Sequence, residues 1–192
     1  MPATATPSAR DRLLSAALAR FGQDGLVAVN LDDVRRDAGV SVGALYHHFE
    51  DKRALADALF VELSSEYQDG FLEVLRVHPG AREGIEAAVR YHLGWVTRHR
   101  SQARILLGER PDTAELRDRN HAFFAAVLAW WRPHVHYRAL RALPLDLIHA
   151  LWLGPAQEYS RLWLAAHARR TPTHIADTLA GAAWNALKED QS

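Results

Sequence analysis

The sequence contains no cysteine, which excludes disulfide bonds and thiol chemistry. It also has no excess of charge, because 23 basic side chains balance 23 acidic ones. Charge balances within the first 53 residues as well, so the overall positive field that draws histone-like proteins to nucleic acid is missing. Any affinity for a charged partner must therefore come from local geometry.

Long apolar runs are also absent. No stretch of the sequence approaches the roughly 20 apolar residues that a membrane span needs. The first six residues lack the charged and apolar regions of a signal peptide. No nucleophile–base pair, phosphate-binding loop or zinc-protease pattern occurs. We therefore expect a cytoplasmic protein that is not an enzyme, needs no cofactor and does not associate with membranes.

Hydrophobic residues make up 48% of the 192 residues, and they recur at helical spacing. No segment alternates as strands do, so the sequence predicts an all-α fold. We expect a disordered arm over residues 1–7 and a domain of short helices over residues 8–53. A long helix from about residue 52 should link it to a second helical domain over residues 54–192.

Capping residues mark the expected helix starts. Ser8 followed three residues later by Asp11 resembles a capping box, and this first helix should end near Gly22 and Gly25. Further starts are expected at Asn30 with Asp33, at Ser41, at Asp51, at Asp112 with Glu115, at Pro144 and at Pro172.

The most specific pattern lies within residues 30–52. Gly39 supplies a left-handed turn, Val40 fills the angle between two helices, and Ser41 caps the second one. A first helix that stops so sharply lets the second cross it and lie in the DNA major groove. The segment is therefore a candidate helix-turn-helix.

This pattern resembles the signature of the TetR family of transcriptional regulators, in which a Gly-Val-Ser turn leads to a Leu-Tyr-x-His-Phe helix and then a lysine. The matching residues are Gly39, Val40, Ser41, Gly43, Leu45, Tyr46, His48, Phe49 and Lys52. The resemblance covers about residues 10–60. One departure is Arg35, where the family places a small alanine; either its stem snorkels along the surface or the two helices are spaced differently.

The resemblance implies a recognition helix that contacts double-stranded operator DNA. Val42 should read thymine methyl groups, while Tyr46 and Lys52 should contact phosphates. Leu45 and Phe49 belong to the core. The full set of candidate DNA-binding residues is Asn30, Ser41, Val42, Gly43, Ala44, Tyr46, His47 and Lys52.

The resemblance also implies that the C-terminal helices enclose a small-molecule cavity. All six tryptophans follow residue 90, and aromatic walls suit a hydrophobic or aromatic effector. Ordinary core packing is the competing explanation for each of them. The candidate ligand-binding residues are Tyr91, His92, Trp95, Phe124, Trp131 and Trp152.

The family further implies a homodimer through the last two helices, expected here over residues 144–167 and 172–188. The first of these is apolar on two sides, which requires a partner. Pro155 should kink it, and Leu162 and Ala183 are expected at the interface.

Three functions remain open on the sequence alone. The first is a repressor that binds a palindromic operator as a dimer and is released by a small effector. The second is a helical binding or scaffold protein without specific DNA recognition, favoured by the neutral charge and by Arg35. The third is a histidine-based metalloenzyme, with His92 and His99 or His134 and His136 as paired ligands, although no cysteine or carboxylate cluster accompanies these residues.

Overall fold

The structure is a computed structural model that describes residues 7–189, without the side chain of Asp24. Within that range the expected all-α fold is confirmed, and β-type pairing is limited to an isolated bridge between Leu140 and Lys188. Residues 1–6 of the expected N-terminal arm lie outside the described residues. The elements are α1 Ala9–Ala28, α2 Leu31–Ala38, α3 Val42–His48, α4 Lys52–Val77, α5 Ala81–Arg98, α6 Arg100–Leu106, α7 Ala114–His136, α8 Leu145–Trp152, α9 Gly154–Leu164, the 3-10 helix η1 Pro172–Ile175 and α10 Ala176–Leu187.

Local capping starts several of these helices as predicted. The Ser8 hydroxyl accepts from the Asp11 N–H, and the Asp11 carboxylate accepts from the Ser8 N–H, both at 3.1 Å. Ser41 caps α3 and Asp51 caps α4 with one bond each, because each side chain accepts from the backbone N–H three residues on. Each cap satisfies an amide that the first turn leaves without a partner.

Two expected helix boundaries and one cap need refinement. The first helix is interrupted at Gly25 (φ 77°, ψ 160°), close to its expected end, and α1 then continues beyond this kink to Ala28. Thr113, not Asp112, caps α7, because its hydroxyl accepts from the Leu116 N–H at 3.2 Å. Asn30 does cap α2, but through the N–H of Asp32 rather than through a reciprocal pair with Asp33.

The expected kinked helix over residues 144–167 is two separate helices. α8 ends at Trp152 and α9 begins at Gly154, with Pro155 in the first turn of α9. A proline is tolerated there because its missing N–H would have no intrahelical partner. In the last segment, Pro172 begins η1 and α10 follows directly.

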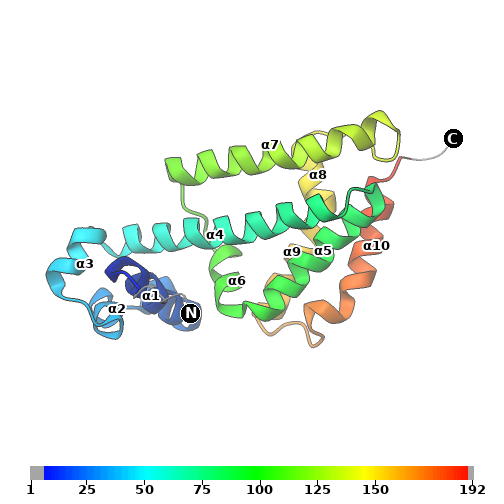
Figure 1. The fold of residues 1–192 in the computed structure, drawn as a ribbon. Helices are drawn as coiled ribbons and strands as arrows, with labels where there is room; N and C mark the ends of the chain where they lie inside the picture. Colours follow the sequence, from blue (N-terminus) through cyan, green and yellow to red (C-terminus); the bar gives the residue numbers. More distant parts are fainter. Residues whose placement is uncertain (1–6, 190–192) are drawn as a thin grey trace, which may run out of the picture.

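α4 runs from the short N-terminal helices into the C-terminal half (Figure 1). Its first half packs with α1, α2 and α3 around a buried cluster that includes Leu13, Val34 and Leu45. Its second half joins a larger cluster with α5, α7, α8 and α10, which includes Phe71 and Trp152. α6 packs against both α1 and α4. The long helix and α6 therefore connect the two halves physically.

Candidate nucleic-acid interface and ligand cavity

The turn between α2 and α3 has the geometry that its sequence predicts. Gly39 adopts φ 62° and ψ 38°, the left-handed conformation that costs a residue with a Cβ about 1 kcal/mol or more. Its N–H and that of Val40 donate back to the last carbonyls of α2. Val40 is buried, as expected for a residue that fills the angle between the helices. α3 therefore leaves α2 abruptly.

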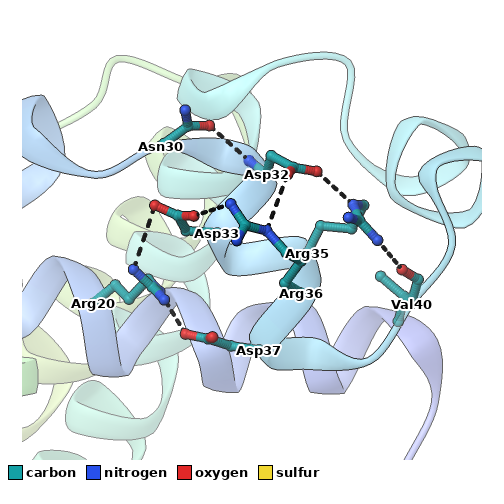
Figure 2. Close-up of polar contacts among 8 residues, drawn as sticks. All are labelled: Arg20, Asn30, Asp32, Asp33, Arg35, Arg36, Asp37 and Val40. Carbon is teal, nitrogen blue, oxygen red and sulfur yellow. Dashed lines mark hydrogen bonds and ion pairs between the residues drawn. The ribbon is translucent and has the colours of Figure 1, made fainter.

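A network of ion pairs covers α2 (Figure 2). Arg20 of α1 pairs with Asp33 at 3.7 Å and Asp37 at 2.5 Å. Arg36 pairs with Asp32 and Asp33 along the helix. Hydrogen bonds from arginine hold the pKa of the Asp32 and Asp37 carboxyls below the usual range. These basic groups are thus paired within the domain, so α2 adds little net positive charge.

Arg35, the departure from the family pattern, joins this network and the turn. Its Nε donates to Asp32 at 2.6 Å, and its Nη1 donates to the Val40 carbonyl at 3.0 Å (Figure 2). The side chain is only 21% exposed. Of the two expectations for this residue, the structure favours the first, because the stem lies along the turn and the guanidinium bonds its backbone.

α3 presents one face outward and buries the other. Leu45 and Phe49 are buried in the N-terminal cluster, as predicted. Val42 and Tyr46 are exposed large side chains, at 54% and 58%. Of the other candidates, Asn30, Ser41, Gly43 and His47 are exposed, and Ala44 is half-buried. The outward face therefore offers an apolar group, a hydroxyl and an imidazole beside a backbone with small side chains.

Lys52, predicted to contact phosphate, has partners inside the domain. Its ammonium donates to the carbonyls of Val27 at 3.2 Å and Val29 at 2.9 Å. These carbonyls belong to the end of α1 and the segment that follows it. The structure thus places Lys52 as a tie between α4 and α1, a role that the sequence did not predict.

A cavity of about 280 Å³ lies among α4, α5, α6, α7, α8 and α9. Phe71, Phe124 and Trp152 supply much of its aromatic lining, and Ile148 and Val127 add aliphatic surface. Most of the lining is apolar with a few polar groups, which is the usual composition of small-molecule sites. The volume is just below the range for such sites, roughly 300–1,000 Å³.

The cavity brings together four of the six predicted ligand residues. His92, Trp95, Phe124 and Trp152 line it. Tyr91 and Trp131 do not. The Tyr91 hydroxyl donates to the Tyr67 carbonyl at 3.0 Å, and Trp131 packs beneath Trp152 with ring centroids 5.7 Å apart.

His92 is held in a buried hydrogen-bond chain. Its Nδ1 lies 2.9 Å from the Tyr67 hydroxyl, and its Nε2 lies 3.3 Å from the Ser160 hydroxyl, which donates to the Ala156 carbonyl. Burial, together with nearby Arg161, lowers the pKa of His92 to about 4. A neutral imidazole that accepts from Tyr67 and donates to Ser160 satisfies every member of this chain.

The polar residues that α4 contributes to the cavity were not predicted from the sequence. Ser64 and Gln68 are both buried at 7% exposure and line it. Gln68 Nε2 donates to Asn120 Oδ1 at 2.8 Å, while Gln68 Oε1 is buried without a partner. Two polar residues four apart on an otherwise buried helix face are a signal that would have indicated them.

The histidines considered as metal ligands have other neighbours. His99 stacks on Trp95, His134 packs edge-on against Trp130, and His136 lies against Tyr137. Among the described residues no group of three or more metal-ligating side chains is assembled. Within the same range no helix is long and apolar enough to cross a membrane.

The faces of α8 and α9 that point away from the cavity carry exposed apolar residues. Leu147 is 46% exposed and Leu162 is 41% exposed. Ala183 of α10, expected at a dimer interface, is instead 4% exposed within this chain, in the C-terminal cluster. That expectation is wrong, because the subunit's own helices already cover Ala183.

Comparison with known proteins finds a family match in the N-terminal part of the chain. Residues 13–59 match the sequence model described as "Bacterial regulatory proteins, tetR family". The regulator BetI of Rhizobium meliloti (strain 1021) is 31% identical over 84 residues, 44% of this chain and 41% of that protein. The class D tetracycline repressor protein of Escherichia coli is 30% identical over 107 residues, 54% of this chain and 46% of that protein. The alignments thus span less than half the length of these relatives.

Solved structures share the fold along nearly the whole chain. A TetR family transcription regulator from Marinobacter aquaeolei VT8 superimposes with a TM-score of 0.79 over 95% of this chain and 96% of its own, at 20% identity. The regulator FadR from Bacillus subtilis, solved in complex with stearoyl-CoA, gives a TM-score of 0.70 over 91% and 97%, at 16% identity. At these identities the likeness concerns the fold.

Proposed function

We propose that this chain is a transcriptional repressor of the TetR family of bacterial regulatory proteins, whose sequence model residues 13–59 match. It binds a palindromic operator as a homodimer and is released by a small hydrophobic or aromatic effector. Residues 8–53 form the DNA-binding domain, and residues 54–192 bind the effector and the second subunit.

The outward face of α3 carries the DNA-binding proposal. A turn built on Gly39 sets α3 apart from α2, and the exposed Val42 and Tyr46 project from it without a role in the core. Val42 suits apolar contact with thymine methyl groups, and the Tyr46 hydroxyl suits a phosphate. The remaining proposed contacts are Asn30, Ser41, Gly43, Ala44, His47 and Lys52. The Lys52 ammonium donates two of its three N–H groups to backbone carbonyls, so the third is the one proposed to contact DNA.

The cavity supports the effector proposal. His92, Trp95, Phe124 and Trp152 line it and are the proposed ligand contacts; Tyr91 and Trp131 support its wall from behind. α6 ends at the cavity and packs against α1 of the DNA-binding domain. A ligand that displaces α6 therefore has a short mechanical route to the helix-turn-helix.

The dimer proposal rests on α8 and α9. Exposed Leu147 and Leu162 lie on helices whose other faces are already buried inside the subunit. A second copy that presents the same face would cover both in a symmetric interface. With α10 alongside, this is the segment of the chain expected to pair.

Selection of binding sites from random duplex DNA tests the central proposal. The expected result is a palindromic consensus whose affinity for the protein falls steeply with salt. Tyr46→Phe should weaken binding to all sequences alike, and Val42→Ala should change base preference. Tyr137→Phe, which alters a 79% exposed tyrosine outside the DNA-binding domain, is the matched control. Failure to select any sequence would favour the alternative of a scaffold protein of the same fold.

A further inference from the structure

The charged side chains that line the cavity are all positive. Arg110 from the segment after α6 and Arg161 from α9 both line it. No aspartate or glutamate occurs among the described residues of the lining. The charged side chains of the lining are therefore all cationic, although the protein as a whole is neutral.

Arg161 is only loosely neutralised. Its nearest carboxylate is that of Glu158, at 3.6 Å, which is longer than an ordinary charge-assisted hydrogen bond. Its Nε donates to the Leu107 carbonyl at 3.3 Å, which anchors the stem beside the cavity wall. The side chain is half exposed. A guanidinium held in this way keeps donors available for an incoming anion.

Arg110 occupies the open side of the same cavity. It is exposed, and its positive charge contributes, after burial, to a lowered pKa of His149, another lining residue. His92, near Arg161, is likewise neutral at neutral pH. The two imidazoles thus offer hydrogen bonds without adding charge, and the two arginines supply the positive potential.

The deeper part of the cavity has the opposite character. Phe71, Ile148 and Trp152 are almost completely buried there. The buried Gln68 Oε1 has no partner and is suited to accept one hydrogen bond from a donor. The lining thus combines exposed cationic side chains with buried apolar ones and a buried acceptor that has no partner.

We propose that the cavity takes an amphipathic monoanion, whose acidic group binds Arg110 and Arg161 at the mouth and whose apolar body lies against Trp152. This inference rests on the proposed function, because it specifies the chemical class of the effector. A carboxylate suits the planar donors of arginine, which bind it through two parallel hydrogen bonds. Apolar burial supplies most of the affinity, and the arginines select for charge.

The competing interpretation of the same lining residues is an aromatic cage that binds an organic cation. Tyr67, Trp95 and Trp152 provide ring faces for it. Such a ligand would meet two positive charges and no carboxylate in the lining, and like charges oppose one another across a short distance in a poorly screened site. The positive charge of the lining therefore favours an anionic ligand over a cationic one.

Three probes that share an eight-carbon chain and differ in the head group test the proposal: octanoate, 1-octanol and octyltrimethylammonium. Binding to the full chain is followed by quenching of tryptophan fluorescence, since Trp95 and Trp152 line the cavity. Octanoate should bind most tightly and octyltrimethylammonium most weakly. Raising the salt concentration should weaken the binding of octanoate and leave the binding of 1-octanol unchanged.

Arginine variants test which side chains bind the acidic group of the ligand. Arg110→Gln and Arg161→Gln should each raise the Kd for octanoate about three- to tenfold and leave that for 1-octanol unchanged. Arg132→Gln, which alters an exposed arginine of α7 outside the cavity, should change neither. Equal affinity for octanoate and 1-octanol, or tightest binding of the cation, would overturn the anionic class while leaving the cavity as an effector site. Failure of all three probes would overturn the site itself, and operator selection would still test DNA binding separately.

Discussion

Arg35 and Val40 are joined by a hydrogen bond of 3.0 Å from guanidinium Nη1 to the backbone carbonyl, across the turn between α2 and α3. Because Asp32 holds the same guanidinium at 2.6 Å, the arginine fixes the backbone of the turn from outside. The orientation of α3 is thus set partly by a side chain on the preceding helix.

Arg35→Ala should lower the free energy of unfolding by about 1 kcal/mol, because one largely buried hydrogen bond to a carbonyl is lost. Arg36→Ala is the matched control, since Arg36 is 61% exposed and pairs only with carboxylates of its own helix. Urea denaturation measures both. An Arg35→Ala protein as stable as wild type would mean that the contact contributes nothing.

Two glycines of the motif should respond differently to alanine. Gly39→Ala places a Cβ in a left-handed conformation and should cost about 1 kcal/mol of stability. Gly43→Ala lies in α3, where an added Cβ meets only Ser41 Oγ at 4.0 Å, so stability should hold or rise. Operator binding should nevertheless weaken in Gly43→Ala, because the new methyl group faces the DNA. Thermal unfolding and DNA titration separate the two effects; equal operator affinity in Gly43→Ala and wild type would remove Gly43 from the interface.

His92 should make stability depend on pH. In the unfolded chain its ordinary pKa of 6.5 lets it take up a proton as the pH falls, whereas in the folded protein it remains neutral down to about pH 4. The unfolded state therefore binds more protons in this window, and stability is lost as the pH falls from 6.5 towards 4. The contribution is about 2 kcal/mol between pH 7 and pH 5.

His92→Gln is the variant that isolates this effect. It should be less stable than wild type at pH 7, because the Tyr67 and Ser160 bonds change, but its stability should vary less between pH 7 and pH 5. Urea denaturation at the two pH values provides the comparison. An identical pH dependence in both proteins would show that other groups, such as His149, are responsible.

Features that depend on contacts within one helical turn could be predicted from the sequence. The Ser8 and Ser41 caps and the left-handed Gly39 each involve neighbours at most four residues away. The cavity could be predicted only in part, because six helices far apart in sequence meet there. Helical periodicity places Trp131 inward, but it cannot tell a cavity wall from the layer beneath Trp152. No local pattern links Arg110 with Arg161, which only the packing of α6 and α9 brings to one site.

The exposed leucines of α8 and α9 should set the oligomeric state. Leu147→Glu and Leu162→Glu should each shift the protein towards monomers, because a buried, unpaired carboxylate is costly in a symmetric interface that repeats it twice. Val27→Glu, at a 94% exposed position in the N-terminal half, is the control for adding charge in place of an apolar side chain. Sedimentation velocity distinguishes the states. Dimers that persist in both leucine variants would place the interface elsewhere.

The contact between α1 and α6 should couple the two halves of the protein. Gly22 lies so close to α6 that an added Cβ would be 2.5 Å from Ser101 Cβ, and its carbonyl accepts from Arg104 at 3.0 Å. α6 ends at Leu106, which lines the cavity, so one short helix touches both the cavity and the DNA-binding domain. Gly22→Ala should force the two helices apart and cost about 1–3 kcal/mol of stability. It should also weaken operator binding, although Gly22 is distant in sequence from α3.

The double variant Gly22→Ala with Ser101→Gly tests whether this contact is the cause. Removing the Ser101 side chain relieves the contacts with Cβ and Oγ and leaves only Ser101 Cα, at 3.1 Å, so stability and operator affinity should both recover in large part in the double variant. Residues in direct contact deviate from additivity, and a double-mutant cycle measures the deviation. Independent effects of the two substitutions would instead mean that Gly22→Ala acts within α1 alone, and the route from the cavity to the helix-turn-helix would then have to run along α4.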